Sequence, residues 1–270
     1  MVPAQAPSQR RALVTGASSG IGEATAGLLA QEGYRVALLA RRESELERVR
    51  ASLAHPERHV CVPCDLRDSA ALIRAAAVVG ERFGALDLLV QNAGHGYLAR
   101  VEESRSDVLR SLVETNVVAV LDLARESLPL LRRGERPVMV LVSSIVARRG
   151  IPGQVAYAAS KAALNSIGEG LRIEWASESV AVSLLDVGLT RTPFFATQPN
   201  PSGLPGPDVS GAESPERVAA KILALDRRPQ PERWMSWKWR ALSLVGLIAP
   251  RLSDRLLVRR MGGGWRTPER

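Results

Sequence analysis

The chain has 270 residues, a formal net charge of +8 and 46% hydrophobic residues. This length suits one large α/β domain, and no Gly-, Ser- or Pro-rich linker divides the middle of the sequence. Residues 1–11 include Pro3, Pro7 and two arginines but no apolar run of signal-peptide length, and no uninterrupted apolar run elsewhere is long enough to span a bilayer. We therefore expect a cytoplasmic protein with one hydrophobic core.

The positive charge lies at one end of the chain. Residues 227–270 contain eleven Lys or Arg and three Asp or Glu, whereas the preceding 226 residues are electrically neutral. The basic pI of about 10.4 therefore describes the tail rather than the whole domain. We expect no nucleic-acid partner.

The two cysteines, Cys61 and Cys64, have C-x-x-C spacing. A structural zinc site would need four ligands, and only His55 and His59 lie near enough in the sequence to complete one. Two small apolar residues on a buried strand are the better interpretation. We expect no metal.

A short apolar strand over residues 11–14 leads into a glycine-rich turn and then a helix. Glycines stand at 16, 20 and 22, and apolar residues follow at helical spacing. Gly16 would permit the tight turn, Gly20 would let backbone N–H groups approach a pyrophosphate, and Gly22 would let the helix pack closely. Residues 15–22 therefore predict a dinucleotide-binding turn.

The second predicted strand, 34–40, ends at Arg41 and Arg42. An acidic residue at this place would bind a free ribose 2′-hydroxyl, whereas arginine suits a 2′-phosphate. The pair favours NADP(H) over NAD(H). The alternative is that both arginines simply begin a solvated helix rich in glutamate.

The middle of the chain predicts a third strand ending at 64–66, a helix capped by Asp68 that runs to Phe83, and a fourth strand over 86–90. A second small turn follows at 91–94. A helix over about 106–131 would place Asn116 in an apolar stretch, where its amide must find partners. Asn116 either ties the helix to nearby backbone or holds a water behind Lys161, and both can be true.

A fifth apolar strand, 138–142, closes with Ser143 and Ser144, and Tyr157 and Lys161 stand four residues apart on the predicted helix that follows. One helical face would therefore present a phenol and an ammonium together. A phenol has a pKa of about 10, and an adjacent cation lowers it toward the working range. Tyr157 would then be a usable general acid or base, with a hydroxyl at the carboxyl end of a strand beside it.

These elements alternate, which predicts a Rossmann-type, doubly wound α/β domain with a parallel sheet and helices on both faces. A sixth strand is predicted over 180–185. We assign 1–10 to a flexible arm, 11–230 to the catalytic domain, and 231–270 to a last strand with a basic helical extension. The Pro- and Gly-rich segment of about 189–213 is interpreted as a substrate lid, with a disordered surface loop as the alternative.

The tail begins after a helix capped by Ser214 with Pro215 at its first position. A seventh strand over 233–237 would precede a helix, 239–249, that is apolar nearly all round, and a leucine and arginine helix beyond Pro250. Tryptophans among cations suit a bilayer interface, so residues 231–261 predict a possible peripheral membrane contact. A buried role, closing the substrate pocket or an oligomer interface, is the favoured alternative.

Several spaced motifs together resemble the short-chain dehydrogenase/reductase family over roughly residues 11–195. They are TGASSGIG at 15–22, Asp65, NAG at 92–94, Asn116, Ser144, Tyr157 with Lys161, and Gly188 with Thr192. Gln91, Val187 and Thr190 depart from the usual family pattern, which leaves the turn near the nicotinamide undefined.

The resemblance implies a seven-stranded Rossmann fold, a nicotinamide cofactor, no metal, and a homodimer or homotetramer. It implies a catalytic set of Asn116, Ser144, Tyr157 and Lys161. It also implies cofactor contacts from Gly16, Ser18, Ser19, Gly20, Ile21, Gly22, Arg41, Arg42, Asp65, Leu66, Asn92, Ala93, Gly94, Tyr157, Lys161, Gly188, Thr190 and Thr192.

The resulting hypothesis is an NADP(H)-dependent oxidoreductase that interconverts a carbonyl and a secondary alcohol on an apolar or lipid-like substrate. A dehydratase or epimerase with the same fold is one alternative. A cofactor-binding membrane-surface or scaffold protein is another, and its support is the basic tail.

Overall fold

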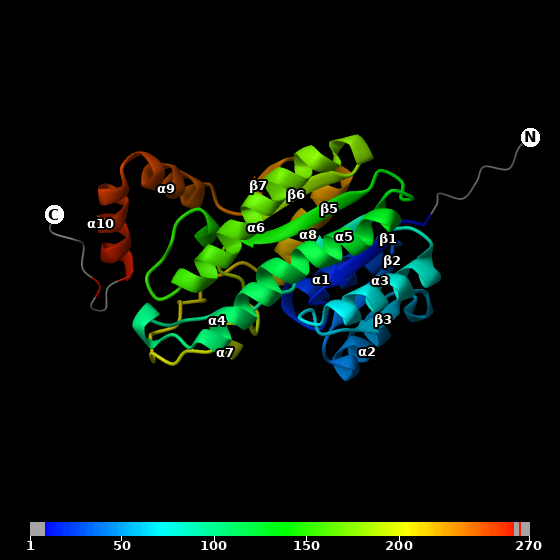
Figure 1. Ribbon diagram of the computed structural model, residues 1–270, viewed down its shortest axis with the longest axis horizontal. Helices are drawn as coiled ribbons and strands as arrows, with labels where there is room; N and C mark the ends of the chain where they lie inside the picture. The colour runs from blue at the N-terminus through cyan, green and yellow to red at the C-terminus, as the bar shows by residue number, and fades with distance from the viewer. Residues whose placement is uncertain (1–8, 262–264, 266–270) are drawn as a thin grey trace, which may run out of the picture.

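Seven parallel strands form a single sheet in the order β3-β2-β1-β4-β5-β6-β7 in the computed structural model, which describes residues 9–261 and 265 (Figure 1). The strands are β1 Arg11–Thr15, β2 Arg35–Ala40, β3 Val60–Pro63, β4 Leu88–Gln91, β5 Val138–Ser144, β6 Ala181–Val187 and β7 Glu232–Trp234. The strand order reverses between β1 and β4, which opens a crevice at their carboxyl ends. The predicted doubly wound α/β fold is confirmed.

Helices cover both faces of the sheet. The α-helices are α1 Gly20–Gln31, α2 Glu43–Ser52, α3 Ser69–Phe83, α4 Ser106–Val113, α5 Ala119–Leu131, α6 Val155–Glu174, α7 Phe194–Thr197, α8 Pro215–Arg227, α9 Trp237–Ile248 and α10 Pro250–Met261. One apolar cluster packs α1, α2 and α8 against the sheet, and a second packs α3, α5 and α6 against the opposite face. The inner strands β1, β2, β4, β5 and β6 are therefore buried on both sides, which explains the continuous apolar runs of the sequence.

The predicted helix caps are confirmed, whereas some strand limits differ. The side chains of Asp68 and Ser214 accept hydrogen bonds from the first turns of α3 and α8. The fourth strand begins at Leu88 instead of residue 86, because the N–H of Leu86 donates to the carbonyl of Leu130 outside the sheet. The seventh strand is shorter than 233–237, since Trp237 already begins α9.

The tail adds two helices at one end of the molecule, away from the amino-terminal end (Figure 1). Trp234 and Trp239 pack against the apolar cluster of Ile145, Val146 and Ala158, which fits the expected buried role. Trp237, however, is 75% exposed, and no residue of α9 is fully buried. The outer side of α9 is therefore not covered by the described part of this chain, and burial of that side in an oligomer interface stays a prediction.

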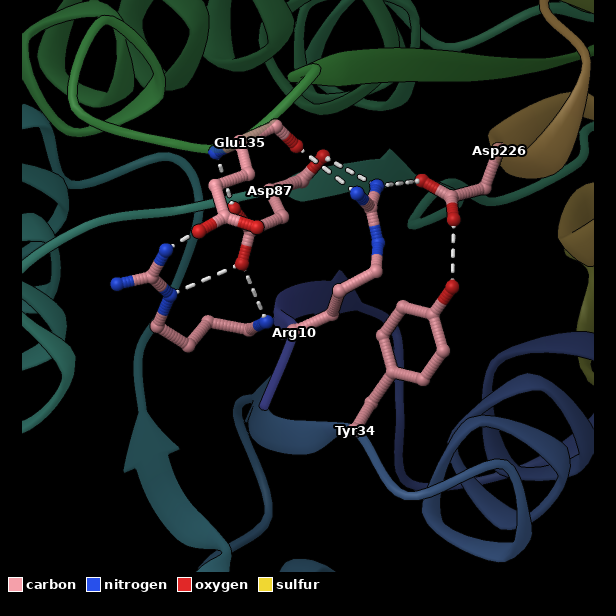
Figure 2. Close-up of polar contacts among 6 residues, drawn as sticks. Arg10, Tyr34, Asp87, Glu135 and Asp226 are labelled. Atoms are coloured by element: carbon pink, nitrogen blue, oxygen red, sulfur yellow. Dashed lines mark hydrogen bonds and ion pairs between the residues drawn. The ribbon is translucent and has the colours of Figure 1, made fainter. Parts of the chain in front are cut away.

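Charged residues join the amino-terminal ends of the strands into one network (Figure 2). The Arg10 side chain donates to the carboxylate of Asp226 at 2.6 Å and to the carbonyl of Glu135 at 2.8 Å, and the Tyr34 hydroxyl donates to Asp226 at 2.5 Å. The predicted flexible arm over 1–10 is thus too long by at least Arg10. Residues 1–8 lie outside the described part of the chain.

Asp87 is the more deeply buried of the two aspartates in this network, with 1% of its surface exposed against 6% for Asp226. Its carboxylate accepts hydrogen bonds from the backbone N–H and the guanidinium of Arg11 and from the N–H of Glu135, at 2.6 to 3.0 Å. Burial alone would raise the pKa of Asp87, but these donors hold it below its usual range.

Asp87→Asn should lower the free energy of unfolding by roughly 3 kcal/mol, because it leaves the Arg11 guanidinium without its carboxylate. Since the folded-state pKa of Asp87 is depressed, its stabilisation is present above the unfolded carboxyl pKa of about 4 and is lost as pH falls through the lower folded value. The loss on substitution should therefore shrink in acid. Urea unfolding at neutral and acidic pH measures this.

Asp107→Asn is the matched control, because Asp107 pairs with Arg105 on the exposed surface. Its unfolding midpoint should equal that of the wild type. Equal midpoints for Asp87→Asn and the wild type would show that the buried network does not stabilise the fold.

Candidate active site

The glycine-rich turn lies between β1 and α1 at the crevice. Gly16 and Gly20 have φ of +67° and +57°, a region that side chains with a Cβ rarely adopt. A Cβ on Gly22 would lie 2.2 Å from the carbonyl oxygen of Gly16, and one on Gly20 would lie 2.9 Å from the Thr192 side chain. The turn can therefore present backbone N–H groups at the start of α1 to a ligand, which fits a dinucleotide pyrophosphate.

A second turn packs directly on the first. The Asn92 side chain donates to the carbonyl of Thr15 at 2.9 Å, and the backbone N–H groups of Asn92 and Ala93 both donate to the Thr15 hydroxyl at 2.9 Å. Thr15 thereby fixes the two turns to each other. Sequence analysis gave Thr15 no role, although its place immediately before Gly16 was a signal.

Two arginines border the cleft at the end of β2. Arg41 and Arg42 line it, and Arg42 donates to the Ser18 hydroxyl at 3.3 Å. Asp65 and Leu66, after β3, lie in the same lining. Hydrogen bonds from Arg67 lower the pKa of Asp65 to about 2, and the charge of Arg41 also contributes, so this acid is a carboxylate at neutral pH.

Ser144, Tyr157 and Lys161 converge further along the cleft. Ser144 ends β5, and α6 carries the other two side chains one helical turn apart. The Lys161 ammonium donates to the carbonyl of Val142 at 3.0 Å and lies 6.0 Å from the centre of the Tyr157 ring. All three residues line the cleft, and the Ser144 hydroxyl lies within hydrogen-bonding reach of the Tyr157 phenol.

Burial controls the protonation of Tyr157 and Lys161. It raises the pKa of Tyr157 to about 12, against a smaller lowering by a hydrogen bond with Ser144, and it lowers the pKa of Lys161 to about 8. The expectation that Lys161 lowers the pKa of Tyr157 is not met in this structure, because removal from water outweighs the distant cation. At neutral pH the phenol keeps its proton and the amine is mostly charged.

Asn116 lies behind the cleft in a π-helical turn, η3 Glu114–Val118, that interrupts the helix predicted over 106–131. Its amide nitrogen donates to the His95 carbonyl and the Ser160 hydroxyl, and its oxygen accepts from the His95 N–H. A Cβ on Gly94 would lie 2.9 Å from this oxygen and 3.6 Å from the Lys161 nitrogen. Asn116 thus holds the loop that borders Lys161, and the predicted tie to backbone is confirmed.

One cleft of about 1800 Å³ contains nearly all the predicted site residues. Gly22 and Asn116 are the exceptions. They lie against Gly16 and Gly94, respectively, which are part of the lining. Ligand pockets commonly have volumes of about 300 to 1,000 Å³, so this cleft has room for a dinucleotide and a substrate together. Gly188, Thr190 and Thr192 border it after β6.

The predicted lid, 189–213, borders the same cleft. Its ends are joined by a bridge between Thr190 and Glu213, and it includes the short helix α7. Phe194 packs 5.6 Å from Tyr157 between ring centres, and the carbonyl of Pro199 accepts the N–H of Leu98. The segment is therefore folded over the substrate side, and its opening and closing stay a prediction.

Comparisons with known proteins give the family. A model of the family described as short chain dehydrogenase matches residues 10–202. An uncharacterized oxidoreductase of Mycobacterium tuberculosis is 30% identical over 253 residues, which are 92% of this chain and 97% of the relative. The chain belongs to the short-chain dehydrogenase family.

Solved structures of this family have the same fold. An alcohol dehydrogenase from Thermococcus sibiricus, complexed with 5-hydroxy-NADP, is 28% identical with a TM-score of 0.75, covering 84% of this chain and 96% of its own. A 3-ketoacyl-(acyl-carrier-protein) reductase from Brucella melitensis, complexed with NADH, is 26% identical with a TM-score of 0.76 and the same coverage. As a short-chain dehydrogenase, the present protein is an oxidoreductase of a family that uses a nicotinamide cofactor.

This short-chain dehydrogenase also has polar groups, one lining the cleft and others behind Ser144, that the sequence did not predict. His95 borders the cleft, and its Nε2 is buried without a hydrogen-bond partner among the described residues. Asp186 on β6 is fully buried beside Glu232, and burial and that neighbouring carboxyl raise the pKa of Asp186. Arg148, just beyond Ser144, forms an ion pair with Glu232 at 3.0 Å. Pairs so far apart in the sequence leave no local pattern.

Cys61 lies on β3 and Cys64 directly follows this strand, and both have free thiols. Burial raises the pKa of Cys61 to about 12 and of Cys64 to about 11. Within residues 9–261 and 265, no group of three or more His, Cys, Asp or Glu side chains is placed to hold a metal ion.

Gly22→Ala should weaken NADPH binding by about tenfold or more, because the new methyl group would overlap the carbonyl of Gly16 and displace the turn. Gly27→Ala on the same helix is the control, since a Cβ there meets nothing within 4 Å. That control should bind NADPH normally and be about 1 kcal/mol more stable. Fluorescence titration measures NADPH binding, and thermal unfolding measures stability. Normal NADPH binding by Gly22→Ala would contradict the role of the glycine-rich turn in cofactor binding.

Proposed function

We propose that this protein is an NADP(H)-dependent oxidoreductase that interconverts a carbonyl and a secondary alcohol on an apolar or lipid-like substrate. One observation carries the proposal. The Tyr157 phenol lies beside the Ser144 hydroxyl and one helical turn from the Lys161 ammonium, in the cleft that also contains the glycine-rich turn. A proton donor and a cofactor cradle thus share one cavity.

The residues have distinct roles in this proposal. A bound nicotinamide supplies or accepts the hydride at the substrate carbon. Tyr157 donates its hydroxyl proton to the carbonyl oxygen during reduction, and Ser144 donates a hydrogen bond to the same oxygen. The phenolate left on Tyr157 is stabilised by the charge of Lys161, and Asn116 keeps the loop beside Lys161 in place.

The protonation of the site supports this assignment. Because the pKa of Tyr157 is raised to about 12, the phenol is protonated at neutral pH and ready to donate. Oxidation of an alcohol needs the phenolate instead, which the Ser144 hydrogen bond favours but the burial of Tyr157 disfavours. The protonation of the site therefore favours reduction.

Arg41 and Arg42 support a preference for NADP(H). They border the cleft where β2 ends, the place at which a ribose 2′-phosphate would lie, and guanidinium groups bind phosphate with paired hydrogen bonds. Asp65, a carboxylate in the same lining, is already paired with Arg67 at 2.7 Å.

The substrate side of the cleft supports an apolar ligand. Its lining there includes the aromatic and aliphatic residues Leu98, Ile151, Phe194, Phe195, Leu204, Trp239 and Leu257, together with polar side chains such as Gln154 and Gln198. His95 offers one polar contact. A ligand with an apolar body and few polar groups would lose the least hydration free energy on leaving water for this lining.

The homodimer or homotetramer stays a prediction. Measurement of the molar mass in solution would test it.

Tyr157→Phe should lower kcat for carbonyl reduction by about 10²- to 10⁴-fold, because the proton donor is lost while the ring still packs on Phe194. NADPH affinity should stay within a few-fold of the wild type. Oxidation of NADPH over a panel of aliphatic, aromatic, steroid and acyl-thioester ketones measures the rate.

Tyr34→Phe is the matched control, since Tyr34 loses its hydrogen bond to Asp226 at the opposite end of the sheet. It should lower stability and leave kcat unchanged. Equal rates for Tyr157→Phe and the wild type would remove Tyr157 from the mechanism.

The double substitution Arg41→Ala and Arg42→Ala should weaken NADPH binding by about tenfold or more and change NADH binding little, because only NADPH carries the 2′-phosphate. Arg125→Ala, on the exposed side of α5, should affect neither cofactor. Calorimetric titration of both cofactors gives the ratio, and an unchanged ratio would refute the role of the arginines.

A further inference from the structure

The α9–α10 pair carries an exposed apolar surface at its turn. Leu244, Leu247 and Ile248 share one face of α9, and Leu247 and Ile248 are 82% and 84% exposed. Leu252 and Leu256, one turn apart on α10, are also exposed. Apolar side chains grouped in this way on a helix pair are typical of a surface that contacts a partner.

Cations border this apolar surface. Arg251, Arg255 and Arg259 recur every four residues on α10, next to Leu252 and Leu256, and all three are exposed. Lys238 and Arg240 are exposed on α9. A stripe of leucines beside a stripe of arginines is typical of helices that lie in the interface of a bilayer.

The opposite side of the pair is used for folding. Ser253 and Leu257 are buried, Arg149 forms an ion pair with Asp254, and Gly246 lets the Arg149 side chain approach α9 closely. Trp239 packs on the cluster that includes Tyr157. The exposed leucines therefore belong to a surface that folding leaves uncovered in the described chain.

We propose that α9 and α10 form a docking surface for an anionic phospholipid bilayer. Leu244, Leu247, Ile248 and Leu252 would enter the acyl boundary, while the arginines would reach the headgroups with their side chains extended. No helix among residues 9–261 is long and apolar enough to cross a membrane, so the contact is peripheral.

Charge favours a bilayer over a second copy of this chain. Asp254 is the single acidic residue between Trp237 and Arg259, and it is already paired with Arg149. A symmetric contact through this face would bring arginine stripes together, which is unfavourable. Anionic headgroups around an apolar interior complement both parts of the surface.

The docking surface goes beyond the proposed redox function and does not depend on it. Trp239 and Leu257, from the same two helices, line the cleft. A bilayer bound to the outer face would therefore lie close to the apolar part of the cleft. Vesicle binding is measured without turnover, so failure of either proposal leaves the other standing.

Co-sedimentation of the full chain with phosphatidylcholine vesicles, with and without phosphatidylglycerol, tests the proposal. The wild type should bind the anionic vesicles and lose affinity as salt increases. The double substitution Leu247→Asp and Ile248→Asp should weaken binding by about tenfold or more, and Arg251→Gln with Arg255→Gln by a similar factor. All variants should keep the wild-type thermal unfolding midpoint within a few degrees.

Ile173→Asp is the matched control, because Ile173 is 76% exposed on α6, outside this surface. It should bind vesicles like the wild type. Absence of wild-type binding to anionic vesicles would overturn the proposal, as would unchanged binding by the α9 double variant. Light scattering that shows a wild-type dimer and a monomeric α9 double variant would identify a second copy as the occupant instead.

Discussion

The burial of the Lys161 ammonium is the constraint around which the active end of this protein is arranged. Only 5% of the residue is exposed, and the hydrogen bond recorded for its ammonium goes to the backbone carbonyl of Val142 instead of a carboxylate. A charge removed from water is costly unless the fold holds its partners in place, and the lowered pKa of Lys161 reflects that cost. The carboxyl end of β5 provides this carbonyl, the glycine loop that follows β4 borders the ammonium, and the π turn places Asn116 behind this loop.

The two ends of the sheet differ: the amino-terminal ends of the strands carry a network of ion pairs, and the carboxyl ends carry the cleft. At the amino-terminal ends of the strands, Asp87 and Asp226 bind arginines that join segments far apart in the sequence, and every one of these groups has a partner of opposite charge. At the carboxyl ends, the cleft lining includes the buried Nε2 of His95, which has no hydrogen-bond partner among the described residues. Sites that bind ligands need such free donors, and the paired network at the opposite end offsets part of their cost.

The sequence predicted those features that depend on neighbouring residues. The glycines of the first turn, the caps at Asp68 and Ser214, and the spacing of Tyr157 and Lys161 are local patterns, and the structure contains each of them. Contacts between distant segments could not be read in the same way. Thr15 receives N–H groups from a turn more than 70 residues later, and Asp186 meets Glu232 only because β6 and β7 are adjacent. The pKa of Tyr157 was predicted in the wrong direction for a related reason, since burial is a property of the whole fold.

Helix α9 of the tail has one side packed on the domain and one side uncovered. Its composition, apolar nearly all round, predicted burial, but α9 touches the catalytic domain along one side only, chiefly through Trp239. An apolar helix that is half covered must either pack against something else or lie in a less polar solvent than water. The arginines of α10 are at the border of the uncovered side, where they would obstruct packing against another basic surface and suit contact with phosphate groups. Arg149 joins α10 to the segment that follows Ser144, and Trp239 and Leu257 line the cleft, so this helix pair is also part of the cleft wall.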